Sequence, residues 1–138
     1  MIIDASIVVK WLVEEEDSAQ AATLAGRGDL HAPSTLTVEI GHVLTKLARA
    51  RTISRDEARV AWDDLGGMPL VLLPADRLLR PAFDLSLRLN ASYHDCVYLA
   101  LALAMDDVLV TADGRFVRSV RSARDLERQV LTLVEATA

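Results

Sequence analysis

The sequence predicts an α/β fold, a three-layer α/β/α domain with a central, mainly parallel sheet. Short apolar segments alternate along the chain with longer segments in which apolar residues recur at helical spacing. Strands that alternate with helices in this way form parallel sheets that are covered on both faces. The length of 138 residues fits one domain, so residues 1–138 are assigned to a single domain.

Five short apolar segments are the predicted strands. Asp4 follows the first one directly, while Pro33 and Pro74 come directly after the second and the third. A proline cannot donate to the hydrogen-bond ladder, so each of these prolines is expected to end its strand. The predicted strands are residues 1–3, 30–32, 70–73, 108–110 and 130–133.

Six segments have the apolar spacing of helices. Ser34 and Ser54 each precede one of them, and a serine in that position is a typical N-cap. The predicted helices, with these two caps included, are residues 5–13, 17–25, 34–50, 54–65, 77–89 and 93–105.

Composition excludes several classes of protein. Cys96 is the only cysteine, so an internal disulfide and a cysteine-based zinc site are both excluded. The longest apolar run, residues 97–105, has nine residues and is too short to cross a bilayer. The apolar start lacks a basic leader, so a cytoplasmic protein is expected. A net charge of −5 argues against a passive nucleic-acid binder, but not against an enzyme with an acidic site.

Two aspartates lie where the strands of such a sheet end. Asp4 ends the first strand and Asp113 comes three residues after Val110. Ligands bind at the carboxyl ends of parallel strands, so both side chains are expected to face one crevice. Each also has a purely local explanation. Asp4 fits an N-cap for the helix that begins at Ala5, and Asp113 fits the first residue of an Asp-Gly turn.

Two further acids lie on predicted helices. Asp95 stands three residues after Ser92, a spacing similar to that of a capping box. Glu39 lies on a helical stripe that is expected to face the core, and no arginine or lysine is placed to pair with it, since Lys46 would have to fold back. The residues of this stripe are Leu36, Glu39, Ile40, Val43 and Leu47.

Four carboxylates in one crevice would repel one another, which raises their pKa values and destabilises the fold. A divalent cation removes this repulsion, and hard carboxylate oxygens suit Mg²⁺ or Mn²⁺. Zinc is a poor second choice, because His31, His42 and His94 do not form an i, i+4 pair and no cysteine cluster exists.

Four segments together resemble the PIN-domain ribonucleases. They are IDASIVVKWL, PSTLTVEIGHVL, YHDCVYLALALA and VLVTADGRF. Within this family the chain is most similar to the VapC toxins of bacterial and archaeal toxin–antitoxin pairs. The resemblance extends over nearly the whole chain and includes the order and spacing of all four acids. The chain differs from many relatives at His94, which stands between Tyr93 and the third acid.

The resemblance implies a PIN-like domain that acts as a Mg²⁺- or Mn²⁺-dependent endoribonuclease on RNA, is inhibited by a cognate antitoxin of the VapB type, and is usually a homodimer. The acids of the family and their two hydroxyl neighbours map onto Asp4, Glu39, Asp95 and Asp113, and onto Ser6 and Thr111.

Phosphodiester hydrolysis needs an in-line water and charge neutralisation, which one or two metal ions supply. We expect Asp4, Asp95 and Asp113 to bind the metal directly or through water. Glu39 is expected to bind through water or to orient the attacking water. Ser6 and Thr111 are expected to hold these ligands or waters in place.

Arginines recur every three residues after Asp113, at positions 115, 118, 121 and 124. Arg115 and Arg118 are the predicted contacts to RNA phosphates, because several members of this series would share one side of a helix or turn. The alternative is an ordinary solvated face.

Three other functions were weighed. A haloacid-dehalogenase-type phosphatase needs a second aspartate two residues after the first, where this chain has Ser6. A receiver domain needs a lysine late in the chain, whereas the last lysine is Lys46. A catalytically silent PIN-like module that only binds a partner has no use for four clustered acids.

Overall fold

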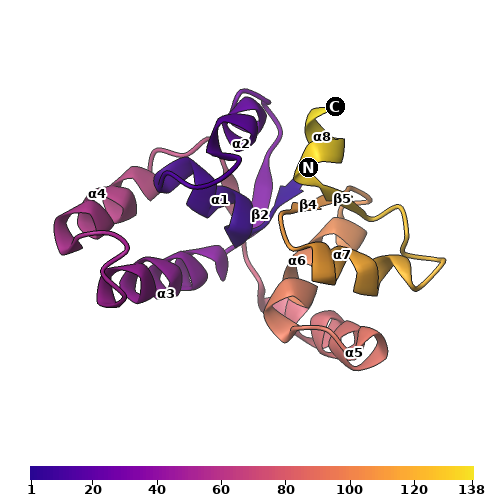
Figure 1. The fold of residues 1–138 in the computed structure, drawn as a ribbon. Coiled ribbons are helices and arrows are strands. Elements are labelled where there is room, and N and C mark those ends of the chain that lie inside the picture. Colours follow the sequence, from indigo (N-terminus) through magenta and orange to yellow (C-terminus); the bar gives the residue numbers. More distant parts are fainter.

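The computed structural model describes residues 1–138 and contains one five-stranded sheet whose strands are all parallel. Helices α1 to α4 lie on one side of this sheet and α5 to α7 on the other (Figure 1). The predicted α/β/α architecture is therefore confirmed. The strands, in the order of the sheet, are β3 (Val71–Leu73), β2 (His31–Pro33), β1 (Ile2–Ile3), β4 (Leu109–Thr111) and β5 (Val130–Thr132).

Eight α-helices and one short 3₁₀-helix connect these strands. They are α1 (Ala5–Leu12), α2 (Ser18–Ala25), α3 (Leu36–Arg49), α4 (Arg55–Leu65), η1 (Asp76–Leu78), α5 (Leu79–Leu89), α6 (Tyr93–Ala104), α7 (Gly114–Arg121) and α8 (Leu133–Thr137). None of these helices has the length and apolar character needed to span a membrane.

The direction of the chain reverses beside the central strand. From β1 the chain passes outward to β2 and β3. It then returns to β4 on the other side of β1, where Ile3 pairs with Val110. Such a switch point opens a crevice at the carboxyl ends of the two diverging strands. In this protein those ends are the ends of β1 and β4.

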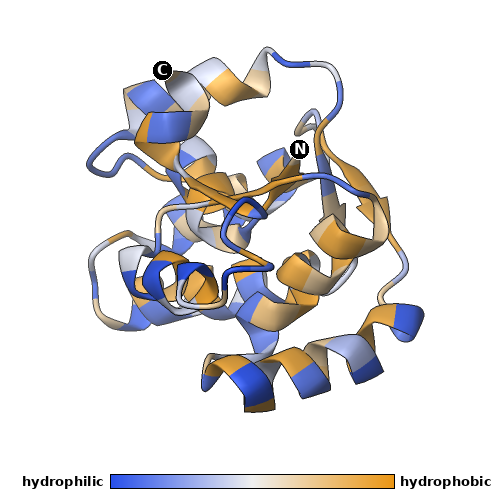
Figure 2. Ribbon diagram, turned by 90° about the vertical axis from the view of Figure 1, so that its right-hand side faces the viewer, coloured by the Kyte–Doolittle hydropathy of each residue, from blue (hydrophilic) through white to orange (hydrophobic).

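The inner strands are apolar because both faces of the sheet are covered (Figure 2). Ile2, Ile3, Leu109 and Val110 have no exposed surface. Helix α6, which crosses the sheet beside β1, β2 and β4, is also buried along most of its length. The carboxyl ends of β1 and β4 are thus anchored in the buried core of the molecule.

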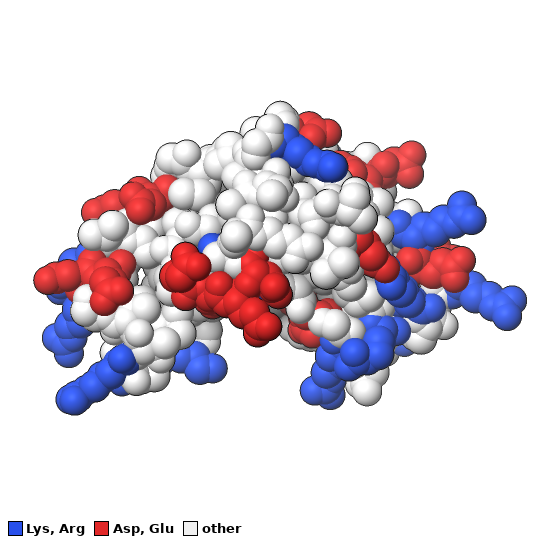
Figure 3. Space-filling model, turned by 45° about the horizontal axis from the view of Figure 1, so that its top comes forward, with Lys and Arg blue, Asp and Glu red and all other residues white.

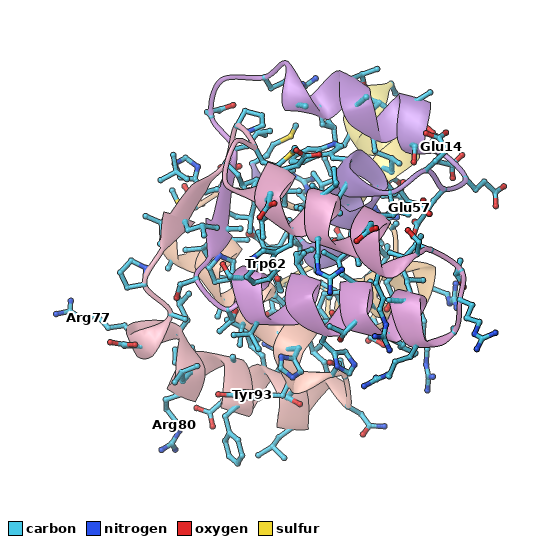
Figure 4. The ribbon with its side chains drawn as sticks, turned by 90° about the vertical axis from the view of Figure 1, so that its left-hand side faces the viewer. Glu14, Glu57, Trp62, Arg77, Arg80 and Tyr93 are labelled. Atoms are coloured by element: carbon cyan, nitrogen blue, oxygen red, sulfur yellow. The ribbon has the colours of Figure 1, made fainter.

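The hairpin of α3 and α4 is packed closely at one glycine. Trp62 of α4 lies over α3 (Figure 4), and a Cβ atom added at Gly41 would come within 3.2 Å of the indole ring. Such a contact is shorter than a carbon–carbon van der Waals distance. An alanine at this position would therefore make the indole of Trp62 shift by a few tenths of an ångström, so Gly41 suits the close approach of the two helices.

Pro33 was predicted to come directly after the second strand, but it is itself the last residue of β2. The amide of His31 donates to Met1 on the β1 side, so the nitrogen of Pro33, two residues later, faces the same side. Strand β1 pairs with β2 only at His31. The missing N–H of Pro33 therefore costs no ladder bond.

Three predictions were wrong in detail, and two helices, α7 and α8, were not predicted. The helix predicted at residues 77–89 begins as the 3₁₀ turn η1, and the last strand ends at Thr132, where α8 follows. Ser34 is not the cap of α3. Its amide donates to Leu73 at the end of β3, while Thr35 occupies the cap position without a side-chain bond.

Ser54, by contrast, forms a complete capping box with Glu57, as its predicted role requires. We expect Ser54→Ala to lower the free energy of unfolding by about 1 kcal/mol, because the amide of Glu57 at the start of α4 loses its acceptor. Ser34→Ala is the matched control and should change stability by less than about 0.5 kcal/mol. Urea denaturation of both variants measures the difference, and equal losses would show that the capping box contributes nothing.

Candidate active site

A cavity of about 370 Å³ opens at the switch point, where β1 and β4 end. All four predicted acids line it, although they come from four different parts of the chain. In the space-filling view, acidic side chains concentrate at the notch between two lobes, and basic ones lie on both flanks (Figure 3). The lining residues are Asp4, Ala5, Ser6, Val9, Lys10, Glu15, Glu39, Val43, Asp95, Ala112 and Asp113.

Asp4 is held at the bottom of this cavity. It is the N-cap of α1 and is only 4% exposed, and its Oδ1 accepts hydrogen bonds from the Ser6 hydroxyl and from the amide of Ile7, the latter at 3.3 Å. The local explanation and the crevice placement are therefore both correct. The second carboxylate oxygen makes no protein hydrogen bond, which leaves it free for a ligand.

Ser6 and Thr111 join the ends of β1 and β4. The Ser6 hydroxyl accepts from the amide of Ala112 at 2.9 Å and lies 3.4 Å from the hydroxyl of Thr111. Thr111 in turn accepts from the amide of Asp113 at 3.0 Å. These bonds fix the relative position of the two strand ends and thus of the two aspartates.

Asp113 does not begin an Asp-Gly turn, contrary to the local alternative. It is the N-cap of α7, and its Oδ1 accepts from the amides of Arg115 and Phe116 at 3.0 and 3.1 Å. As with Asp4, capping uses one oxygen and fixes the side chain. The other oxygen has no protein partner.

Glu39 lies on the predicted apolar stripe, between the buried residues Leu36 and Ile40. Its side chain is 19% exposed, and its Oε1 is buried without a hydrogen-bond partner. The absence of a lysine or arginine partner was predicted correctly. The exposed imidazole of His94 is close by, with its Nδ1 3.8 Å from Oε1.

Asp95 lies on the first turn of α6, and the proposed capping box with Ser92 was wrong. The Ser92 side chain makes no cap bond, and only its backbone carbonyl accepts from the amide of Cys96. A short aspartate side chain does not reach back to the Ser92 amide as a glutamate would. Asp95 is instead directed into the cavity that Asp4 and Asp113 line.

The carboxylates that line the cavity repel one another when they are ionised. Burial raises the pKa of Asp4 to about 6 and that of Glu39 to about 7, and the charges of neighbouring acids add to both shifts. Burial and the charge of Asp113 raise the pKa of Asp95 as well. Such values are typical of sites built for a cationic ligand or for proton transfer.

The donor set fits a hard divalent cation. Asp4 and Asp113 each keep one oxygen without a protein partner, and Glu39 Oε1 is a buried acceptor without a donor. No three acidic, histidine or cysteine side chains stand close enough together to form a ready chelate. The acids line a common cavity, and a cation there would need their side chains to move closer together.

Two residues of the site escaped sequence reasoning. Lys10 lines the cavity and is held by the carbonyl of Glu16 at 2.7 Å and by Glu15 at 3.4 Å. The second is Tyr98 of α6, whose hydroxyl lies next to the Glu39 carboxylate. The signal for Lys10 was its position, since it lies on the same short helix that Asp4 caps. The pairing with Glu15 depends on the turn after α1, which the sequence does not specify.

The predicted phosphate contacts lie outside the cavity. Arg115 and Arg118 are exposed on α7 and make no ion pair. Arg121 does not share their role, because its guanidinium donates to Glu135 of α8 at 2.6 Å and to the carbonyl of Val130. The series with three-residue spacing therefore combines three solvent-facing arginines, Arg124 included, with one that ties α7 to α8.

A larger hollow of about 1080 Å³ lies along α3 and α4, lined by Trp62 and several arginines. Glu57 is its only acid, and that side chain serves the capping box of α4. Volume alone does not mark an active site. The smaller cavity has the convergent, perturbed carboxylates that chemistry requires.

Comparisons with known proteins agree with this geometry. Residues 1–121 match the PIN domain family. Ribonuclease VapC1 of Mycobacterium tuberculosis is 34% identical over 118 residues, which cover 83% of this chain and 86% of that protein.

Two solved structures share the fold. PAE2754 from Pyrobaculum aerophilum has a TM-score of 0.71 at 16% identity, with 99% of this chain and 85% of that one covered. A toxin–antitoxin complex from Klebsiella pneumoniae has a TM-score of 0.61 at 14% identity, with 96% of each chain covered. The chain belongs to the PIN-domain family and is a relative of the VapC ribonucleases within it.

Proposed function

We propose that this protein is a metal-dependent endoribonuclease toxin that hydrolyses RNA phosphodiester bonds in the cytoplasm. The observation that carries the proposal is the convergence of Asp4, Glu39, Asp95 and Asp113 on one cavity at the switch point. The 34% identity to a protein named as a ribonuclease supports the reaction class. Mg²⁺, with Mn²⁺ as a substitute, is the proposed cofactor, because every candidate ligand is a carboxylate.

Each acid has a role that its surroundings allow. Asp4, Asp95 and Asp113 would hold the metal, which supplies charge neutralisation on the scissile phosphate when bound. Glu39, set back in α3, would orient the attacking water and accept its proton, since its pKa of about 7 suits a base near neutral pH. Ser6 and Thr111 keep Asp4 and Asp113 in position through the bonds described above.

The cavity also contains a cation for the substrate. Lys10 is 12% exposed and is the one basic side chain among the cavity-lining residues, so we assign it a phosphate beside the scissile bond. Arg115 and Arg118, on the adjoining helix α7, would extend this contact along the RNA backbone.

Lys10→Gln should weaken the binding of a single-stranded RNA about tenfold and lower the slope of log affinity against log salt by about one, because one phosphate contact is lost. Lys46→Gln, which removes the other lysine of the chain on the exposed side of α3, is the matched control. Fluorescence anisotropy at several salt concentrations measures both. An unchanged slope for Lys10→Gln would rule out the contact.

The partners are proposed on the same grounds. A structural neighbour is a toxin–antitoxin complex, so we propose a cognate antitoxin of the VapB type as the inhibitor. A homodimer is proposed from the resemblance to the family. Sedimentation of the purified chain, alone and with its antitoxin, tests both assignments.

The decisive test is cleavage of total cellular RNA by purified protein with Mn²⁺, with wild type and Asp95→Asn compared and the new RNA ends mapped by sequencing. Cuts that need both Mn²⁺ and Asp95 would support the nuclease and identify its substrate. A folded, antitoxin-free wild type that makes no cut in any RNA fraction would favour the catalytically silent partner-binding module instead.

A further inference from the structure

Beneath the acidic cavity lies a tyrosine whose hydroxyl has no protein partner. Tyr98 of α6 is 1% exposed, and its ring packs in the core. Its Oη is nevertheless buried without a hydrogen bond. A buried, unpaired hydroxyl destabilises the fold, so a phenylalanine would pack better in the core unless the hydroxyl has a use.

The hydroxyl faces the Glu39 carboxylate. Burial raises the pKa of Glu39, and the neighbouring Tyr98 hydroxyl lowers it. The alignment falls short of a well-formed bond, because Tyr98 Oη and Glu39 Oε1 are both buried and both unpaired. Burial and the carboxylates of Glu39, Asp4 and Asp95 raise the pKa of Tyr98 far above its usual range, so the hydroxyl keeps its proton and can only donate it in a hydrogen bond.

Each of these two unpaired atoms can serve as the hydrogen-bond partner of the other. No lysine or arginine reaches Glu39, and the imidazole of His94 lies at 3.8 Å on the solvent side with 68% of its side chain exposed. Tyr98 is therefore the donor available from the core side. Ionisation of Glu39, which a bound cation would favour, would strengthen its attraction for this donor.

We propose that Tyr98 is a positioning residue for Glu39, whose hydroxyl donates to Oε1 when the metal is bound and so directs the carboxylate toward the attacking water. This inference rests on the proposed function. In the structure Tyr98 Oη and Glu39 Oε1 both lack a hydrogen-bond partner, so this bond has still to form. In the metal-bound protein it fixes the orientation of Glu39 in the way that neighbouring groups orient metal ligands elsewhere.

The test is Tyr98→Phe, which removes the hydroxyl alone. Tyr93→Phe is the matched control, since Tyr93 is the only other tyrosine and lies at the outer end of α6, bonded to the carbonyl of Leu79 (Figure 4). For Tyr98→Phe we expect Mn²⁺ affinity, measured by calorimetry, to fall about tenfold and kcat to fall about 10–100-fold, with KM for RNA unchanged. The melting temperature of the metal-free variant should equal or exceed that of wild type.

A double-mutant cycle with Glu39→Gln separates the positioning role from a general effect. If Tyr98 acts through Glu39, Tyr98→Phe should have little further effect on Mn²⁺ affinity in the Glu39→Gln background. Additive effects would overturn the inference, as would a metal-free Tyr98→Phe that is markedly destabilised or a Tyr98→Phe that matches Tyr93→Phe in kcat and Mn²⁺ affinity. If wild type neither binds Mn²⁺ nor cleaves RNA, the proposed function fails first, and this inference fails with it.

Discussion

Asp4→Asn is expected to abolish RNA cleavage, with a loss of about 100-fold or more, and at the same time to stabilise the metal-free protein. Loss of groups that merely orient metal ligands costs 10–100-fold, so loss of a ligand charge should cost at least as much. Asparagine caps helices as well as aspartate does, and its carbonyl can still accept from Ser6 and Ile7. The substitution therefore removes the charge and little else.

The gain in stability follows from burial. Asp4 is 4% exposed, and desolvation raises its pKa to about 6, so its ionised form is unfavourable in the folded state. At pH 8 without metal we expect Asp4→Asn to raise the free energy of unfolding by about 1–3 kcal/mol.

Chemical denaturation in EDTA and cleavage assays in Mn²⁺ measure the two effects on one preparation. Asp63→Asn, at an exposed position of α4, should change neither. A variant that is destabilised without metal would show that Asp4 is retained for the fold, and full activity would exclude it as a ligand.

The sheet and the strand-end acids could be predicted because each follows from a short local signal. The apolar segments at β1 and β4 are buried on both faces, which makes them recognisable as inner strands. Asp4 and Asp113 follow those strands, and parallel strands bring their carboxyl ends together. Glu39 was recognisable as a polar residue on an apolar helical stripe.

The features that escaped prediction depend on tertiary contacts. Ser34 has the composition of a cap, but pairing with β3 takes its amide into the sheet and moves the helix start to Leu36. Arg121 belongs to an exposed series by spacing, yet its partner Glu135 lies on a helix that follows β5. In the sequence Tyr98 looks like an ordinary core residue of α6, because nothing in the neighbouring sequence shows that Glu39 lies next to it.

The second large effect concerns pH. Without metal, the free energy of unfolding should fall by about 2–4 kcal/mol between about pH 5 and pH 8. Asp4 and Glu39 have folded pKa values of about 6 and 7, above their ordinary values of 3.8 and 4.5, so the folded state binds their protons more tightly than the unfolded state. The stability that this contributes is complete below about pH 4 and is lost as the pH rises through 6 and 7.

Exposed pairs act in the opposite direction and at lower pH. The Arg121 guanidinium lowers the pKa of Glu135 to about 2, so its contribution is present above about pH 4.5 and is lost in stronger acid. Stability of the metal-free protein should therefore pass through a maximum near pH 5. A titration of stability in EDTA that rises steadily from pH 5 to pH 8 would contradict the burial of ionised acids at this site.

Saturating Mn²⁺ should remove most of the decline above pH 5. The cation would bind the ionised carboxylates, so its affinity should rise as they lose protons, and at 100 times its dissociation constant it should stabilise the folded state by about 2.7 kcal/mol. The gain from Mn²⁺ should be small at pH 5 and largest at pH 8. Asp4→Asn should reduce both the decline in EDTA and the gain in Mn²⁺, because the same buried charge causes both. If the variant reduced only the decline in EDTA or only the gain in Mn²⁺, the acids that destabilise the metal-free protein would not be the acids that hold the metal.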